Sequence, residues 1–165
     1  MCGRYYRKSD KQKIAEAFHV REVPDFALPD ADYNVAPSTF QPVIRNSKET
    51  SERELVLMRW GLLPYFAKSL TDFKGFSTIN AQAESLMSRA MWRVPFQRRR
   101  CLIPASGFYE WKKIDVKNKQ PYRFEMANGK PFAFAGIWDA WRDPVLKEWL
   151  QSYTIITTTP NELTV

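Results

Sequence analysis

Residues 99–112 read RRCLIPASGFYEWK, and this stretch decides the fold class because it holds two strand-like runs in succession, 100–105 and 108–113. Three further runs of β-branched and aromatic residues follow at 121–126, 131–141 and 149–159. Asn128-Gly129 stands between two of them, a pair that favours a tight turn and predicts a β-hairpin. The second half of the chain is therefore predicted to be β-rich.

The first half mixes helices, strands and a loop. Ser9-Asp10 and the apolar spacing after it predict a helix over about 10–20. The three prolines of 21–41 indicate an irregular loop, and strands are expected at 42–46 and 54–60, joined by a polar turn. Apolar spacing within 80–92 predicts a second helix of about ten residues. We expect an α+β fold: a single mixed α/β domain with a curved, barrel-like, largely antiparallel sheet and two to three helices.

Composition narrows the class of protein. At 165 residues the chain suits one domain, and it has neither a stretch of about 20 apolar residues nor a signal-peptide layout, so we expect a cytoplasmic protein. Two cysteines and one histidine are too few for a disulfide framework or an ordinary zinc site, and we expect neither metal nor cofactor. The net charge of +7 favours an anionic partner such as nucleic acid, although many basic proteins are merely soluble.

Cys2 follows the initiator methionine directly in the opening MCGR. Methionine removal would expose a thiol and a primary amine on adjacent carbons. A conventional cysteine hydrolase needs a partner histidine, and the sole histidine, His19, lies at the end of a predicted helix. For His19 a capping or solvated role is the favoured interpretation, and for Cys2 position alone does not separate function from accident.

Glu110 lies among aromatic residues in SGFYEWK. In a strand, period-2 alternation puts Glu110 on the face of Phe108, with Tyr109 and Trp111 on the other face. A carboxylate in such surroundings could transfer protons near neutral pH. The alternative is an edge-strand glutamate that faces water beside Lys112.

Aromatic and basic residues also alternate in several places, as in Arg59-Trp60, Tyr65-Phe66 near Lys68, and Trp111 before Lys112-Lys113. A single-strand binder needs aromatic faces for bases beside cations for phosphates. The same aromatic residues could form the core, and Arg98-Arg99-Arg100 could be a solvated face.

Together these segments resemble the SRAP family, named for SOS-response-associated peptidases. The resemblance covers nearly the whole chain through ordered motifs: MCGR at the start, YNVAPS at 33–38, RWGLLPYFAK at 59–68, INAQAES at 79–85, RRCLIPASGFYEWK at 99–112 and SYTIITTTPNEL at 152–163. It implies a single mixed α/β domain with a barrel-like core. It also implies a DNA-damage response protein that shields abasic sites in single-stranded DNA through a covalent cross-link to the N-terminal cysteine.

The resemblance implies a role for each matched position. Cys2 would form the covalent bond through a thiazolidine, with Asn80 and Glu110 in supporting polar roles. The positions implied to line the DNA groove are Arg4, Asn34, Pro37, Trp60, Phe66, Trp111 and Thr157. Gln82 stands where the family has an arginine that binds phosphate. The family's H-x-R-M-P segment would lie beyond Val165, so we expect the domain, spanning 1–165, to be truncated at its C-terminal end.

The expected partner is single-stranded DNA with abasic sites, bound by a nucleoid-associated monomer with no membrane contact. Two other functions remain open. One is a peptidase or other hydrolase with Cys2 as nucleophile, and the other is a non-covalent reader of single-stranded or modified DNA.

Overall fold

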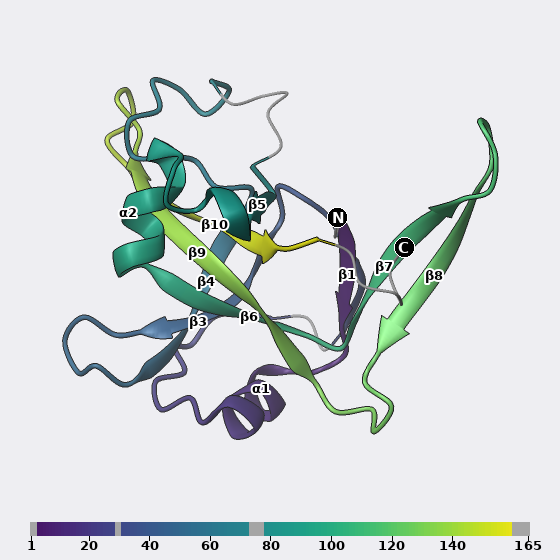
Figure 1. Cartoon of the computed structure of the whole chain (residues 1–165). Helices are drawn as coiled ribbons and strands as arrows, with labels where there is room; N and C mark the ends of the chain where they lie inside the picture. The colour runs from purple at the N-terminus through teal and green to yellow at the C-terminus, as the bar shows by residue number, and fades with distance from the viewer. Residues whose placement is uncertain (1–2, 29–30, 73–77, 160–165) are drawn as a thin grey trace.

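The stretch that decides the fold bends at Ser106 and passes from one sheet into another (Figure 1). Strand β6 (Arg100–Ala105) belongs to a six-stranded sheet, and β7 (Gly107–Lys113) belongs to a four-stranded sheet. The structure is a computed structural model that describes residues 3–28, 31–72 and 78–159.

The next two strands pair with β7 and β6 in reverse order. Strand β8 (Lys119–Glu125) pairs antiparallel with β7, and β9 (Phe132–Arg142) pairs antiparallel with β6. The prediction of a β-hairpin at Asn128-Gly129 is wrong. Gly129 does turn the chain at a φ of 66°, but the turn joins strands of two different sheets. The local turn preference is satisfied, but the strands on either side of the turn pair with β7 and β6 and not with each other.

The six-stranded sheet has the order β4-β3-β6-β9-β10-β5. The strands not yet introduced are β3 (Phe40–Asn46), β4 (Arg53–Trp60), β5 (Asn80–Gln82) and β10 (Trp149–Thr157). A parallel pairing of β10 with β4, in the register Tyr153↔Trp60, closes β4, β3, β6, β9 and β10 into a five-stranded barrel, and β5 pairs with β10 beside it. The predicted α+β fold with a barrel-like, largely antiparallel sheet is confirmed.

The four-stranded sheet has the order β2-β1-β7-β8, in which β1 (Arg4–Arg7) lies between β2 (Asp32–Val35) and β7. Strand β2 contradicts the prediction that 21–41 is loop throughout, because this short run gains its order from pairing with β1. The β7–β8 hairpin projects away from the barrel in Figure 1, and residues 111–123 are exposed.

The first helix forms where expected. Helix α1 spans Lys11–Phe18, and the Asp10 carboxylate caps it by accepting the Lys13 backbone N–H at 2.8 Å. His19 ends the helix in the left-handed conformation at a φ of 53°, so the capping interpretation is confirmed. Ile14 anchors the helix in the core.

The second helix differs from the prediction for 80–92. Residues 80–82 form β5, Ala83–Ser85 form a short 3-10 helix, and the α-helix, α2, spans Ala90–Arg98. The apolar spacing at 83–91 fits a helix that would begin near residue 80. Residues 80–82 instead form β5, which pairs in parallel with β10. Tertiary pairing therefore overrides the local pattern.

Gly107 marks the close approach of three strands. A Cβ atom there would overlap the backbone oxygen of Phe124 and the ring of Tyr6. We expect Gly107→Ala to lower the free energy of unfolding by about 1–3 kcal/mol, because neither neighbour has space to move. Urea unfolding measures this, with Gly3→Ala as control, since a Cβ at Gly3 meets nothing within 4 Å. Equal stability of the two variants would contradict the packing.

Candidate functional site

The first strand of the chain lies inside a sheet, so the start of the chain is held between neighbours. The antiparallel register of β1 with β7 pairs Arg4 with Tyr109 and Tyr5 with Phe108. Extended by one residue, this register brings Gly3 beside Glu110. Cys2, the expected covalent residue, lies outside the described residues.

Alternation along β7 divides its side chains as the sequence predicts. Phe108 packs against Phe124 and Phe134, with ring centroids 5.1 and 5.8 Å apart, so its face of the strand is turned toward the barrel core. Glu110 shares that face and is half-buried. Trp111 lies on the opposite face of β7, and its side chain is 45% exposed.

Trp60 does not line a groove, and this prediction is wrong. Its side chain is 0% exposed and packs between Tyr5 and Tyr153, with ring centroids at 5.1 and 6.4 Å. The indole N–H donates to the backbone oxygen of Ile79 at 3.0 Å. Because Ile79 precedes Asn80, Trp60 holds the strand that carries Asn80 and cannot itself stack on a base.

Asn80 and Thr157 lie on one face of two neighbouring strands. The parallel register pairs Ile155 with Asn80 and Thr157 with Gln82, so the alternate residues of both strands face the same way. The hydroxyl groups of Tyr5 and Tyr153, 2.9 Å apart, join β10 to β1. The start of β1 and the strands of Asn80 and Thr157 therefore meet at one end of the barrel.

Arg4 and Asn34 are in direct contact. The Arg4 guanidinium donates to Asn34 Oδ1 at 2.8 Å, which joins β1 to β2. Pro37 is half-buried in the next loop, where the Ser38 N–H donates to the Trp60 oxygen at 2.9 Å. Arg4 and Asn34 thus lie together on neighbouring strands, and Pro37 follows in the loop that is bonded to Trp60.

Phe66 and Trp111 are the most exposed of the predicted aromatic residues. Phe66 is 48% exposed in the loop after β4 and meets the Tyr65 ring edge-on at 5.3 Å. Trp111 lies on the projecting β7–β8 hairpin. Both rings are about half exposed, and they belong to two different elements.

Sequence reasoning missed the contribution of Tyr5 and Tyr153. Both are buried, at 1% and 0% exposed, and they pack around Trp60 beneath the site. Alternation along RYYR favours one tyrosine inside and one outside, but the partner strand of Tyr5 is not deducible from a local pattern.

The other cysteine is not a competing nucleophile. Cys101 is 6% exposed inside the barrel, and burial raises the pKa of its thiol. The thiol is therefore held in its unreactive protonated form. Among the described residues no cluster of histidine, cysteine, aspartate and glutamate could hold a metal ion.

Tyr6 and Glu125 form a polar pair beside the site. The Tyr6 hydroxyl donates to Glu125 Oε2 at 2.5 Å. Burial, together with this hydrogen bond, raises the pKa of Tyr6 to about 12. The same hydrogen bond holds the pKa of Glu125 below its usual value. The pair thus favours the neutral phenol and the charged carboxylate in the folded protein.

This pair predicts a pH dependence of stability at both ends of the scale. Since the folded pKa of Tyr6 is raised, its contribution is complete below pH 10 and is lost as pH rises toward about 12. The contribution of Glu125 is present above pH 4.5 and is lost as pH falls below that value. Urea unfolding across pH 3–12 should show both losses in the parent chain. Tyr6→Phe should lack the alkaline loss and show a smaller acid loss, because Lys8 and Arg123 still pair with Glu125. Parallel curves for the two proteins would contradict the coupling.

The described parts of the helices include none that is long and apolar enough to cross a membrane. The fold is a closed barrel beside a second sheet, and the first strand of the chain lies within that second sheet. Polar side chains surround the start of that strand. Residues 1–165 match the family described as SOS response associated peptidase (SRAP), and the chain belongs to that family.

Named relatives and solved structures agree with this assignment. The chain is 41% identical over 167 residues to the abasic site processing protein YoqW of Bacillus subtilis, covering 99% of this chain and 70% of that protein. It is 31% identical over 199 residues to mouse abasic site processing protein HMCES, covering 95% of this chain and 56% of HMCES. A crystal structure of a Bacteroides thetaiotaomicron protein superimposes with a TM-score of 0.86 at 27% identity, covering 99% of this chain and 71% of that one.

Proposed function

We propose that this protein processes abasic sites in single-stranded DNA by forming a covalent cross-link through Cys2 after removal of Met1. The observation that carries the proposal is the central position of β1, whose register with β7 brings Gly3 beside Glu110. Relatives named abasic site processing proteins support the same substrate. The burial of Cys101 supports Cys2 as the reactive thiol of the two.

The proposed chemistry uses both groups of an N-terminal cysteine. An abasic deoxyribose opens to an aldehyde, the α-amine adds to its carbon, and loss of one water gives an imine. The thiol then adds to the imine carbon, and its proton goes to nitrogen, which closes a five-membered thiazolidine. An α-amino group titrates near pH 8, so about a tenth is neutral at pH 7, compared with less than about a thousandth of a lysine side chain.

Glu110 and Asn80 have supporting roles in this proposal. Glu110 would transfer protons during opening of the sugar ring and loss of water from the first adduct. Its half-buried position on the barrel-facing side of β7 supports that role. Asn80 would orient the sugar or the amine by hydrogen bonds, held by the strand that Trp60 anchors through Ile79.

The DNA strand would contact cations and aromatic faces around the start of β1. Arg4, held by Asn34, would contact phosphate, and Thr157 and Pro37 would line the groove beside it. Because bound cations release counterions from DNA, non-covalent binding should weaken as salt rises. Phe66 and Trp111 would supply faces for base stacking.

One denaturing gel tests the proposed function. Protein incubated with an abasic single-stranded oligonucleotide should yield a band shifted by the mass of that oligonucleotide. Cleavage of a peptide substrate without such a band would point to a peptidase. Salt-sensitive retention of DNA in a native gel with no covalent band would point to a non-covalent reader. Either of the last two results would overturn the proposal.

Replacement of Phe66 or Trp111 by alanine should weaken non-covalent binding of the same oligonucleotide by about 1–3 kcal/mol each, because each ring would lose a stacked base. Fluorescence anisotropy at fixed salt measures the change. Leu146→Ala is the control, since it removes a side chain that is 67% exposed and has no aromatic face. If all three variants bind alike, the two rings do not stack on bases.

A further inference from the structure

A second concave surface lies where β3, β6, β9 and the end of α2 meet. One of its lining residues, Tyr65, contacts Phe66 of the candidate site edge-on, with ring centroids 5.3 Å apart. Two cavities of about 560 and 500 Å³ share Arg45, Lys48, Arg99 and Trp138 as lining residues. Because they share walls, the cavities form one continuous depression. We call it the arginine groove.

The arginine groove is strongly cationic. Its described lining residues include no aspartate or glutamate. The cations that line it are Arg45, Lys48, Arg53, Arg98, Arg99, Arg100 and Arg142. Within the described part of the chain, only Arg45 and Arg99 of these form salt bridges. The other five carry charge that a bound anion could neutralise.

The floor of the groove is rigid. Trp138 is 5% exposed, and the guanidinium carbons of Arg45 and Arg99 lie 4.5 and 5.8 Å from its ring centroid. Arg45 also donates to Glu54 at 2.6 Å, and Arg99 donates to Asp139 at 2.6 Å. These contacts fix both guanidinium groups against the indole before any ligand arrives.

Exposed aromatic rings stand along the same groove. Tyr65 and Trp149 line its second cavity and are 64% and 67% exposed. The guanidinium carbon of Arg142 lies 5.9 Å from the Trp149 ring centroid. The groove therefore offers flat apolar faces next to cations that form no salt bridge among the described residues.

We propose that the arginine groove binds a segment of single-stranded nucleic acid, with phosphates on its cations and unpaired bases on Trp149 and Tyr65. An acidic peptide would use the cations but not the exposed rings, whereas a single strand supplies a phosphate and a base at every nucleotide. This inference goes beyond the proposed function, because it requires neither an abasic site nor Cys2.

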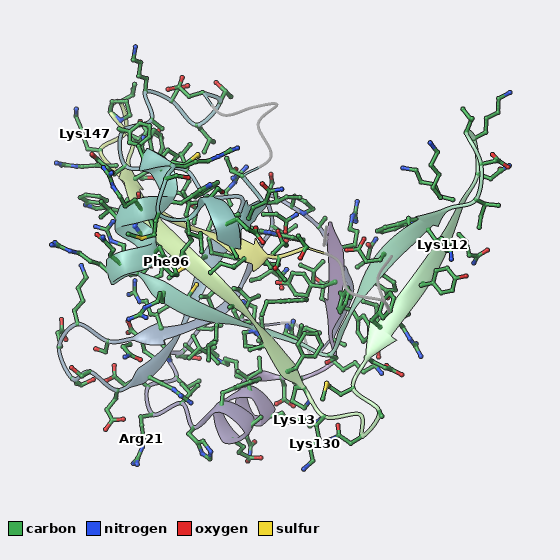
Figure 2. All side chains as sticks on the ribbon, in the orientation of Figure 1. Lys13, Arg21, Phe96, Lys112, Lys130 and Lys147 are labelled. Atoms are coloured by element: carbon green, nitrogen blue, oxygen red, sulfur yellow. The ribbon has the colours of Figure 1, made fainter. Side chains whose placement is uncertain are left out.

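Charge reversal in the groove tests the phosphate contacts. Lys48→Glu/Arg100→Glu should bind an unmodified oligothymidylate of about 15 nucleotides more than about tenfold more weakly than the parent chain at low salt. The plot of log affinity against log salt should also become less steep by about 1.4, because two phosphate contacts are lost. The matched control is Lys13→Glu/Lys130→Glu, whose side chains lie at the α1 side of the molecule in Figure 2 and line neither cavity.

Removal of an aromatic face tests the base contacts. Trp149→Ala should weaken oligothymidylate binding by about fivefold or more, without changing the salt slope. Equal binding by the groove variant and its control would overturn the proposal. So would unchanged affinity of Trp149→Ala together with equal competition by inorganic polyphosphate, because the groove would then bind phosphate without bases.

The same variants separate this proposal from the proposed function. If the parent chain forms no cross-link but the groove variants lose oligothymidylate binding, only the proposed function fails. If the parent chain cross-links abasic DNA and the groove variants bind like their control, only the arginine groove fails. Circular dichroism spectra and urea midpoints equal to those of the parent chain would establish that the variants are folded.

Discussion

A chain that keeps Met1, or that carries a tag ahead of Cys2, should form no heat-stable adduct with abasic single-stranded DNA. The extension converts the α-amine into an amide, which cannot form an imine, while the thiol stays intact. The measurement is the shifted band on a denaturing gel, with the N-terminus verified by mass spectrometry. A thiolate peptidase would tolerate the extension wherever its groove had space, so the two mechanisms give different results.

The matched variant is Cys2→Ser, which keeps the amine and loses the thiol. It should form an imine that borohydride traps but no stable adduct, because an oxazolidine opens far more readily than a thiazolidine. A verified Met-Cys terminus that still yields the same heat-stable adduct would show that the thiazolidine mechanism is wrong.

Glu110→Gln should slow cross-linking by roughly a hundredfold or more, because the amide keeps the shape of the side chain but cannot carry a proton. Single-turnover rates from quenched time courses at saturating DNA measure the chemical step apart from binding.

A control for this variant is Glu49→Gln, an exposed carboxylate in the turn between β3 and β4. This variant removes one negative charge, as Glu110→Gln does, but from a turn that carries none of the proposed site residues. An unchanged rate in folded Glu110→Gln would assign Glu110 to a structural role on β7.

Local patterns in the sequence predicted the elements that depend on neighbouring residues. Asp10 caps α1 because its side chain reaches an N–H three residues ahead. Alternation along β7 correctly put Phe108 and Trp111 on opposite faces, and the structure turns Phe108 toward the core. Both effects act within a few residues, so they are visible before any tertiary structure is known.

Patterns failed where distant segments compete for the same residues. The spacing within 80–92 suits a helix, yet residues 80–82 pair with the far end of the chain in β10. Trp60 shows the same limit at the site. An aromatic residue beside an arginine can stack on a base or fill a core, and packing between Tyr5 and Tyr153 decides for the core.

By itself, the sequence determined the strand-rich composition, the capped first helix, the alternating faces of β7 and the ordered motifs that identify the family. Only the tertiary structure decided that Asn128-Gly129 joins two sheets, that Tyr153 beside Trp60 closes the barrel, and that the arginine run lies in a groove with Trp149. The physical reason is that a residue's own preferences limit its backbone and the face on which it lies. Its partners across the barrel are chosen by the burial of side chains that lie far apart in the chain.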